Sequence, residues 1–120
     1  MVQTFKIPLG QNEFMIDSWD LYYAFPEGKD YFGTMSITNK RLLFEMNTHE
    51  ITDEFVKKSE IFTNPITNVV QIIKDRIISV NADTSNNNKK VLLVFDNGET
   101  HYLNRKMLSI DKVVEALVRK

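Results

Sequence analysis

The stretch GTMSITNKRLLF, from Gly33 to Phe44, decides the fold class of this chain. Apolar and polar side chains alternate on both sides of a polar turn at residues 38–40, and this period of two is typical of strands that bury one face. The stretch therefore predicts two antiparallel strands joined by a tight turn. Leu42 and Met46 fall on the same face of the second strand as Phe44, and we expect all three in the core.

Upstream, residues 13–25 predict one long strand. Leu21 and Tyr23 fall on one face with further apolar side chains, but the polar segment around Asp17 interrupts the pattern. This favours a bend or bulge near Asp17, as sheets that curve into barrels require. A helical turn over residues 18–22 is the alternative.

Downstream, residues 91–95 and 100–103 predict a hairpin. Asn97 and Gly98 stand between them, and Asn-Gly is a pair that tolerates the positive φ angles of tight hairpin turns. We expect these two residues at the centre of the turn and positive φ at Gly98. Alternation then places three side chains of the first strand on one face: Val91, Leu93 and Phe95.

The chain ends in a predicted amphipathic helix. Residues 109–118 begin with Ser109, a residue type that caps helices, and apolar residues at 110, 113, 114 and 117 form one stripe. This stripe must meet the inward faces of the strands. We therefore predict one shared core that contains Leu42, Phe44, Val94, Val113 and Leu117.

The middle of the chain is less regular. Residues 47–65 lack a period of two, and we predict a short helix there that ends at Asn64-Pro65. Residues 66–73 and 77–80 are rich in β-branched side chains and predict two further strands around a turn at residues 74–76.

Length and composition limit the function classes. The 120 residues fit one domain, 1–120, and 42% hydrophobic with 26% charged residues is ordinary for a globular protein. The net charge of −1 provides no global field that would attract nucleic acid, and we expect no nucleic-acid partner. With no cysteine, no leader-like start and no long apolar run, we expect a cytoplasmic protein, untethered or bound peripherally to a membrane.

Four segments in this order resemble the GRAM branch of the pleckstrin-homology (PH) superfold. They are Glu13 at the start of the first strand, residues 33–44, the run from Asp75 to Val80, and Asn97-Gly98 before the last strand. The resemblance implies a mainly β fold, a seven-stranded bent barrel or sandwich capped by one C-terminal α-helix. The chain departs from the family pattern between Met46 and Ile66, where an insertion joins two strands.

The motifs of common enzymes are absent from the sequence, and we expect neither catalysis nor a cofactor. His49 and His101 are the two histidines. We expect a structural or surface role for each, with His101 pointing outward if Tyr102 points inward. Acidic pairs such as Asp17 and Asp20 lack a nearby histidine and are typical of solvated surface.

Candidate surface residues for a ligand or membrane lie in or beside the predicted turns. Clustered basic residues also serve solubility, and most aromatic residues of so small a domain belong to its core. The candidates are Lys29, Tyr31, Phe32, Lys40, Arg41, Lys74, Arg76, Lys89 and Lys90.

The resemblance implies a non-enzymatic binding module that docks onto a membrane surface or a lipid head group through loops at one end of the barrel. The alternative is a protein-interaction or peptide-binding adaptor without lipid affinity. In that mode, an extended peptide adds to an exposed strand edge or lies between strand and helix.

Overall fold

Eight antiparallel strands and one C-terminal helix make up the part of the chain that the structure describes. The computed structural model describes residues 9–26, 30–46, 59–66, 69–83, 89–105 and 108–119. In chain order the elements are β1 (Met15–Ala24), β2 (Asp30–Thr38), β3 (Arg41–Met46), β4 (Phe62–Ile66), β5 (Val69–Ile73), the 3-10 turn η1 (Lys74–Arg76), β6 (Ile77–Asp83), β7 (Lys90–Phe95), β8 (Thr100–Asn104) and α2 (Asp111–Val118).

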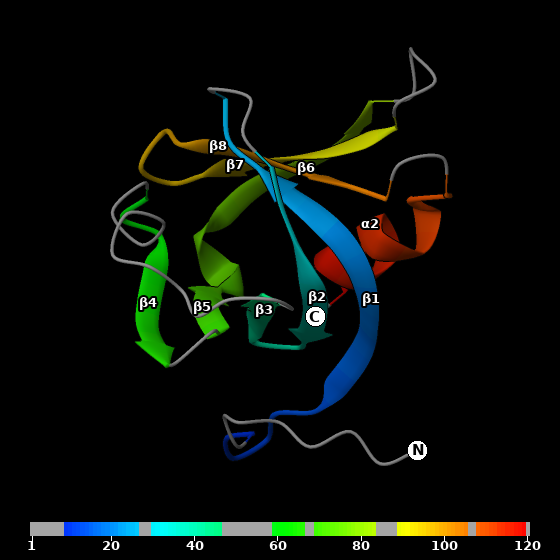
Figure 1. The fold of residues 1–120 in the computed structure, drawn as a ribbon. Helices are drawn as coiled ribbons and strands as arrows, with labels where there is room; N and C mark the ends of the chain where they lie inside the picture. The colour runs from blue at the N-terminus through cyan, green and yellow to red at the C-terminus, as the bar shows by residue number, and fades with distance from the viewer. Residues whose placement is uncertain are drawn as a thin grey trace.

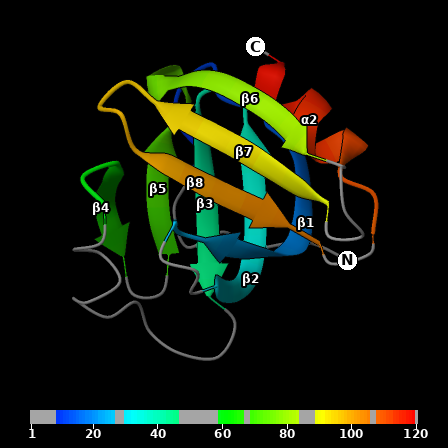
Figure 2. The same cartoon turned by 90° about the horizontal axis from the view of Figure 1, so that it is seen from above.

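The strands form a single bent sheet in the order β4-β5-β3-β2-β1-β8-β7-β6. β1 joins its two halves, because it pairs with β2 over most of its length and with β8 through its last residues. Figure 1 shows β1 curving around the molecule, and in Figure 2 β6, β7 and β8 lie across β2 and β3 as a second layer. This mainly β sandwich with one C-terminal helix is consistent with the PH-like fold class that the resemblance implies, but it has eight described strands rather than seven, because β4 adds an edge strand.

The stretch that decides the fold class forms β2, a turn and β3, as predicted. The Thr38 hydroxyl stabilises the turn by accepting hydrogen bonds from the backbone N–H groups of Lys40, at 3.0 Å, and Arg41, at 2.9 Å. Gly33 is required by the close approach of β3, since a Cβ atom there would lie 2.3 Å from the carbonyl oxygen of Glu45.

β1 is extended throughout, so the alternative of a helical turn is wrong. Its register against β2 shifts between Met15 and Asp17, which confirms the predicted bulge. Beyond the bulge, Leu21, Tyr23 and Phe25 are buried on one face, as alternation predicts. The bulge thus bends the strand at its start, and the later half belongs to the core.

The strand β4 lies where the sequence predicts an insertion. Of the strand predicted over residues 66–73, residues 69–73 form β5 as predicted, whereas residue 66 belongs to β4, which pairs antiparallel with β5. Pro65 lies inside β4 rather than ending a helix. A proline is tolerated there because β4 is an edge of the sheet and its register with β5 shifts between Thr63 and Ile66. Residues 47–58, on which the predicted short helix falls, lie outside the described residues.

The β7–β8 hairpin confirms the predicted positive φ of Gly98, which is +90°. Its central pair is Asp96 and Asn97, however, rather than Asn97 and Gly98. The backbone N–H of Gly98 donates to the Phe95 carbonyl at 3.0 Å, so these two residues mark the ends of the turn. Among the described non-glycine residues, positive φ is confined to Asn12, so Asn97 lacks the φ that the predicted pair would need.

α2 places its apolar stripe on the sheet, as predicted. Ile110, Val113 and Leu117 are buried in the main core cluster. The helix begins at Asp111, later than a cap at Ser109 predicts. The Ser109 hydroxyl still accepts a hydrogen bond from the Asp111 N–H, at 3.3 Å.

The core confirms the alternation predicted for β7. Val91, Leu93 and Phe95 are buried in one cluster with Leu42, Phe44, Val113 and Leu117. Val94 is not part of this cluster, because it lies on the other face of β7 and stays half-buried. Its predicted place in the shared core is therefore wrong.

Candidate functional site

A groove of about 340 Å³, the β6–α2 groove, runs between β6 and the C-terminal end of α2. β6 pairs with β7 on one side, and no other described strand pairs with its second edge. The apolar side chains that line the groove are Ile77, Ile78, Val80, Leu117 and Val118. A strand edge beside apolar side chains is a geometry to which an extended peptide can add.

Two apolar side chains of the β6–α2 groove face solvent. Ile78 is 66% exposed and Val118 is 57% exposed. Ile78 lies where the register of β6 against β7 shifts, between Ile77 and Ser79, and such bulges redirect side chains. Folding of this domain therefore leaves apolar surface uncovered on both walls of the groove.

Lys74 holds the end of α2 in place beside the groove. Its ammonium group donates hydrogen bonds to the carbonyl oxygens of Thr38, at 3.1 Å, and Ala116, at 2.8 Å, and to that of Arg119. A cation at the carbonyl end of a helix is favoured by the helix dipole. Burial lowers the pKa of Lys74, and the charge of Arg119 lowers it further. Lys74 is thus a structural residue whose charge is used inside the domain.

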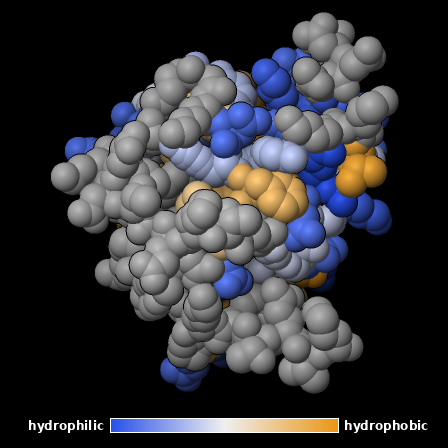
Figure 3. All heavy atoms as spheres, in the orientation of Figure 1, coloured by the Kyte–Doolittle hydropathy of each residue, from blue (hydrophilic) through white to orange (hydrophobic). Residues whose placement is uncertain are grey.

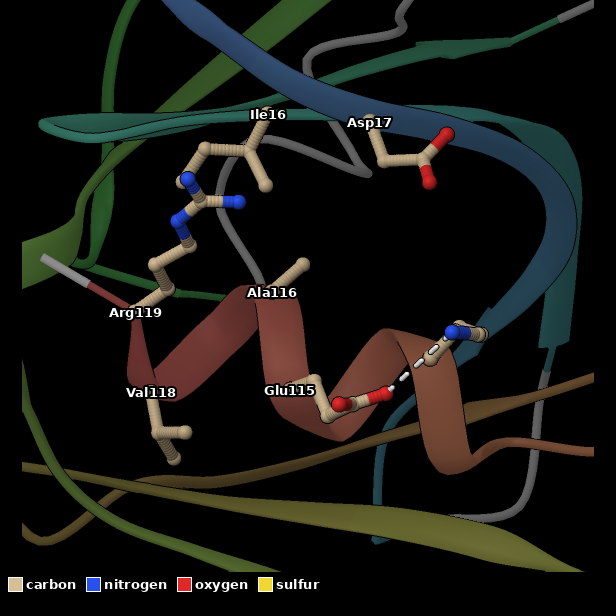
Figure 4. A pocket seen from close by; sticks show the side chains of 7 residues that line it. Ile16, Asp17, Glu115, Ala116, Val118 and Arg119 are labelled. Carbon is tan, nitrogen blue, oxygen red and sulfur yellow. Dashed lines mark ion pairs between the residues drawn. The ribbon is translucent and has the colours of Figure 1, made fainter.

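A second pocket, of about 430 Å³, lies on the other side of α2, against β1 (Figure 4). Figure 4 shows Arg119 extending from the end of α2 toward Ile16. Lys112 and Glu115 form an ion pair at 3.8 Å. The lining residues are Ile16, Asp17, Lys112, Glu115, Ala116, Val118 and Arg119, so charges of both signs stand around it without favouring a ligand of either sign.

The predicted basic residues near the β2–β3 turn are engaged within the domain. Arg41 forms an ion pair with Glu13 at 2.8 Å, and Arg76 forms one with Asp96 at 2.9 Å. The ammonium group of Lys40 donates to a backbone carbonyl at 3.1 Å, although this residue is exposed. Two of these three cations are thus neutralised by a carboxylate.

Lys89 and Lys90 are not brought together with those residues. They lie at the start of β7, whereas Asp96, the partner of Arg76, follows the end of this strand. The ammonium group of Lys90 lies 5.7 Å from the centre of the Tyr102 ring. The described residues therefore hold the candidate cations at separate places.

The aromatic candidates also separate. Tyr31 is buried in the core, so it is not the exposed anchor that the sequence suggests, because the inward face of β2 carries it. Phe32, its neighbour on the other face, is 41% exposed, and its ring centre lies 4.9 Å from that of Tyr22. Lys29 lies outside the described residues.

Figure 3 shows one face of the molecule as a mixture of hydrophilic surface and a limited hydrophobic patch.

A buried polar chain, here called the His101 chain, is not predicted from the sequence. His101 points into the core with 1% exposure, whereas Tyr102 is half-buried on the other face, so the condition under which His101 was expected to point outward is not met. Its Nδ1 meets the hydroxyl of Tyr23, and its Nε2 lies 2.9 Å from Oε1 of Glu99. The hydroxyl of Ser59 donates to the same oxygen, and the N–H of Glu60 donates to the other one at 3.1 Å.

The pKa directions fix the protons of the His101 chain. Burial raises the pKa of Tyr23, helped by the charge of Glu99, so Tyr23 keeps its proton. Burial lowers the pKa of His101 against the opposing effect of Glu99, so the ring is neutral. Burial alone would raise the pKa of Glu99, but hydrogen bonds from Ser59, His101 and neighbouring groups lower it to about 2. The Tyr23 hydroxyl therefore donates to Nδ1, and Nε2–H donates to the carboxylate.

No model of a known protein family matches the chain, and no curated protein matches it either. In the described part of the chain, no group of three or more His, Asp or Glu side chains is placed to hold a metal ion. No helix there is long and apolar enough to cross a membrane. The β6–α2 groove is consequently the feature of the structure that points to a function.

Proposed function

We propose that this domain is a non-enzymatic interaction module that binds an extended peptide segment of a partner protein in the β6–α2 groove. The observation that carries the proposal is the second edge of β6, which no described strand pairs, next to the exposed side chains of Ile78 and Val118. Backbone hydrogen bonds to β6 would provide affinity. Apolar peptide side chains between β6 and α2 would provide specificity.

Docking to an anionic membrane has less support. It depends on basic residues acting together, but Arg41 and Arg76 are paired with carboxylates and Lys74 is used inside the domain. Exposed Lys40 and the lysines at the start of β7 remain, at separate places. Membrane docking is therefore kept as an outcome that the experiment can return.

The test is selection of binders from a random displayed peptide library, followed by NMR mapping of a selected peptide on the labelled domain. We expect shifts concentrated in β6 and the end of α2. N-methylation of alternate peptide amides should abolish binding, because it removes backbone donors while it keeps every side chain. Peptides that map to another surface, or a library without binders, would overturn the proposal.

Matched variants sharpen this test. Ile78→Asp and Val118→Asp should each weaken binding at least about tenfold, because a charge then faces the apolar wall of the groove. Leu108→Asp is the control, since Leu108 is 58% exposed and does not line the groove. Flotation with anionic and neutral vesicles is run in parallel. Salt-sensitive vesicle binding without peptide binding would favour the membrane alternative and count against the groove.

A further inference from the structure

The His101 ring is enclosed by aromatic side chains from β4, from β7 and from the residue that follows β1. Its ring centre lies 4.6 Å from that of Phe95 in β7, 5.1 Å from that of Phe25 after β1, and 5.8 Å from that of Phe62 in β4. Both ring nitrogens are hydrogen-bonded, to Tyr23 and to Glu99. The site therefore suits a neutral imidazole and offers little hydration to an imidazolium.

One wall of this enclosure is less firmly held than the others. β1, β7 and β8 are internal strands with neighbours on both sides, whereas β4 is at the edge of the described strands, where it pairs with β5 with a shifted register. The segment before β4 is held by the Glu99 carboxylate, which accepts hydrogen bonds from the Ser59 hydroxyl and the Glu60 N–H. Opening at an edge strand costs less free energy than opening at a central one.

We propose that residues 59–62 form a proton-controlled latch, which neutral His101 keeps closed over the aromatic enclosure and which opens when His101 is protonated. A proton on Nδ1 would face the Tyr23 hydroxyl, which in the closed form donates its own hydrogen to that nitrogen. Movement of Phe62 and Ser59 away from the ring would admit water to the cation while β1, β7 and β8 stay paired. Glu99 would keep its hydrogen bond with Nε2 in both forms, and this bond becomes an ion pair when the ring is protonated.

The sign of the pH dependence follows from the closed form. Burial lowers the pKa of His101 in the closed form below its ordinary value of 6.5, and this effect is removed when opening hydrates the ring. The closed latch is therefore favoured fully above pH 6.5, and the preference is lost as the pH falls from 6.5 toward the lower pKa. Glu99 faces the ring in both forms, so it favours the proton in each and does not change this sign. Farther from the ring lie the charges of Arg76, Asp96 and Glu60. The hydrogen bond and the charge of Asp96 raise the pKa of Arg76, and the charge of Glu60 raises it further.

Amide hydrogen exchange tests the latch. The reporters are the N–H groups of Glu60, bonded to Glu99, and of Ile61, bonded to the Ser59 hydroxyl at 3.0 Å. Once intrinsic exchange rates are divided out, their protection should fall by up to about tenfold per pH unit below pH 6.5, the slope for one proton. The fluorescence of Trp19 should stay constant, because the sheet stays folded. Protection of Glu60 and Ile61 that does not change between pH 7.5 and 5 would overturn the proposal.

Two variants assign the effect. His101→Gln should abolish the pH dependence of both reporters, whereas His49→Gln, which changes the only other histidine, should leave it intact. If His101→Gln does not fold, NMR titration of the His101 ring in the unmodified protein replaces it. The ring should take up its proton over the same pH range in which the two amides lose protection. A ring that stays neutral while the amides open would overturn the latch.

Discussion

The His101 chain and the β6–α2 groove differ in whether folding of the domain covers them. In the His101 chain, four polar side chains from distant parts of the sequence satisfy one another inside an aromatic enclosure. In the groove, an edge strand and exposed apolar side chains are left without a covering element among the described residues. Since buried polar groups must be paired to be stable, the first region contributes to folding, whereas the second is surface that a partner can cover.

The sharpest contrast between interior and groove lies within α2 itself, at two consecutive residues. Leu117 is 4% exposed and Val118 is 57% exposed. Leu117→Ala should lower the free energy of unfolding by about 2–5 kcal/mol, because it leaves a cavity in the core. Val118→Ala should change it by about 0.5 kcal/mol or less. Urea unfolding followed by circular dichroism measures both, and equal losses would contradict the assignment of the two faces.

A second contrast lies in the dibasic turn. Arg41→Gln should destabilise the domain by about 3 kcal/mol, because it leaves the carboxylate of Glu13, whose side chain is 3% exposed, without its cation. Lys40→Gln, at an exposed position, should cost about 0.5 kcal/mol or less. Chemical denaturation at pH 7 compares them.

Acid provides the control for the Arg41 variant. Burial would raise the pKa of Glu13, but hydrogen bonds from Arg41, Gly10 and Thr38 outweigh it and the pKa is lowered. The stability that this pair contributes is therefore present above pH 4.5 and is lost as the pH falls through the lower folded pKa. The cost of Arg41→Gln should shrink in acid. A cost that is the same at pH 7 and pH 3 would show that Arg41 acts by packing alone.

Within the His101 chain, Tyr23→Phe should cost about 1–3 kcal/mol, because it removes the donor to Nδ1 and leaves a buried acceptor unpaired. Tyr22→Phe is the control on the neighbouring, half-buried position. Thermal and chemical unfolding measure the difference. If both variants are equally stable, the hydrogen bond between Tyr23 and His101 contributes nothing to the free energy of unfolding.

The sequence predicts those features of the fold that depend on a local pattern of residues. Alternation over β2, β3 and β7 and the glycine of the β7–β8 hairpin are set by neighbouring residues, so they can be recognised without a structure. The His101 chain joins Tyr23 to a residue 78 positions later, and alternation alone cannot say which face of β8 is buried. Lys74 was expected on a binding surface, and its structural role could not be predicted for the same reason, since its carbonyl partners lie as far away as α2. The strand β4 was missed because Pro65 is tolerated only at an edge, and sheet order is a property of the whole chain.

The β7–β8 turn, which precedes Glu99 of the His101 chain, requires a residue with positive φ at position 98. Gly98 has φ +90°, and no heavy atom lies within 4 Å of a Cβ built there. Gly98→Val should therefore cost about 1 kcal/mol or slightly more through backbone strain alone. Gly10→Val is the control, since no positive φ is found at Gly10. Unfolding midpoints measure both, and equal losses would contradict a conformational cause at Gly98.

The smallest effect on stability is expected in the groove. Ile78→Lys replaces a side chain that is 66% exposed at a bulge on an edge strand, a place where proteins commonly carry lysine to prevent association of strand edges. The free energy of unfolding should change by about 0.5 kcal/mol or less. Light scattering at high protein concentration should show less self-association than in the parent chain, because the open edge then carries charge. A large loss of stability would instead show that Ile78 packs as a structural residue. The groove would then contribute to the free energy of unfolding as the interior does.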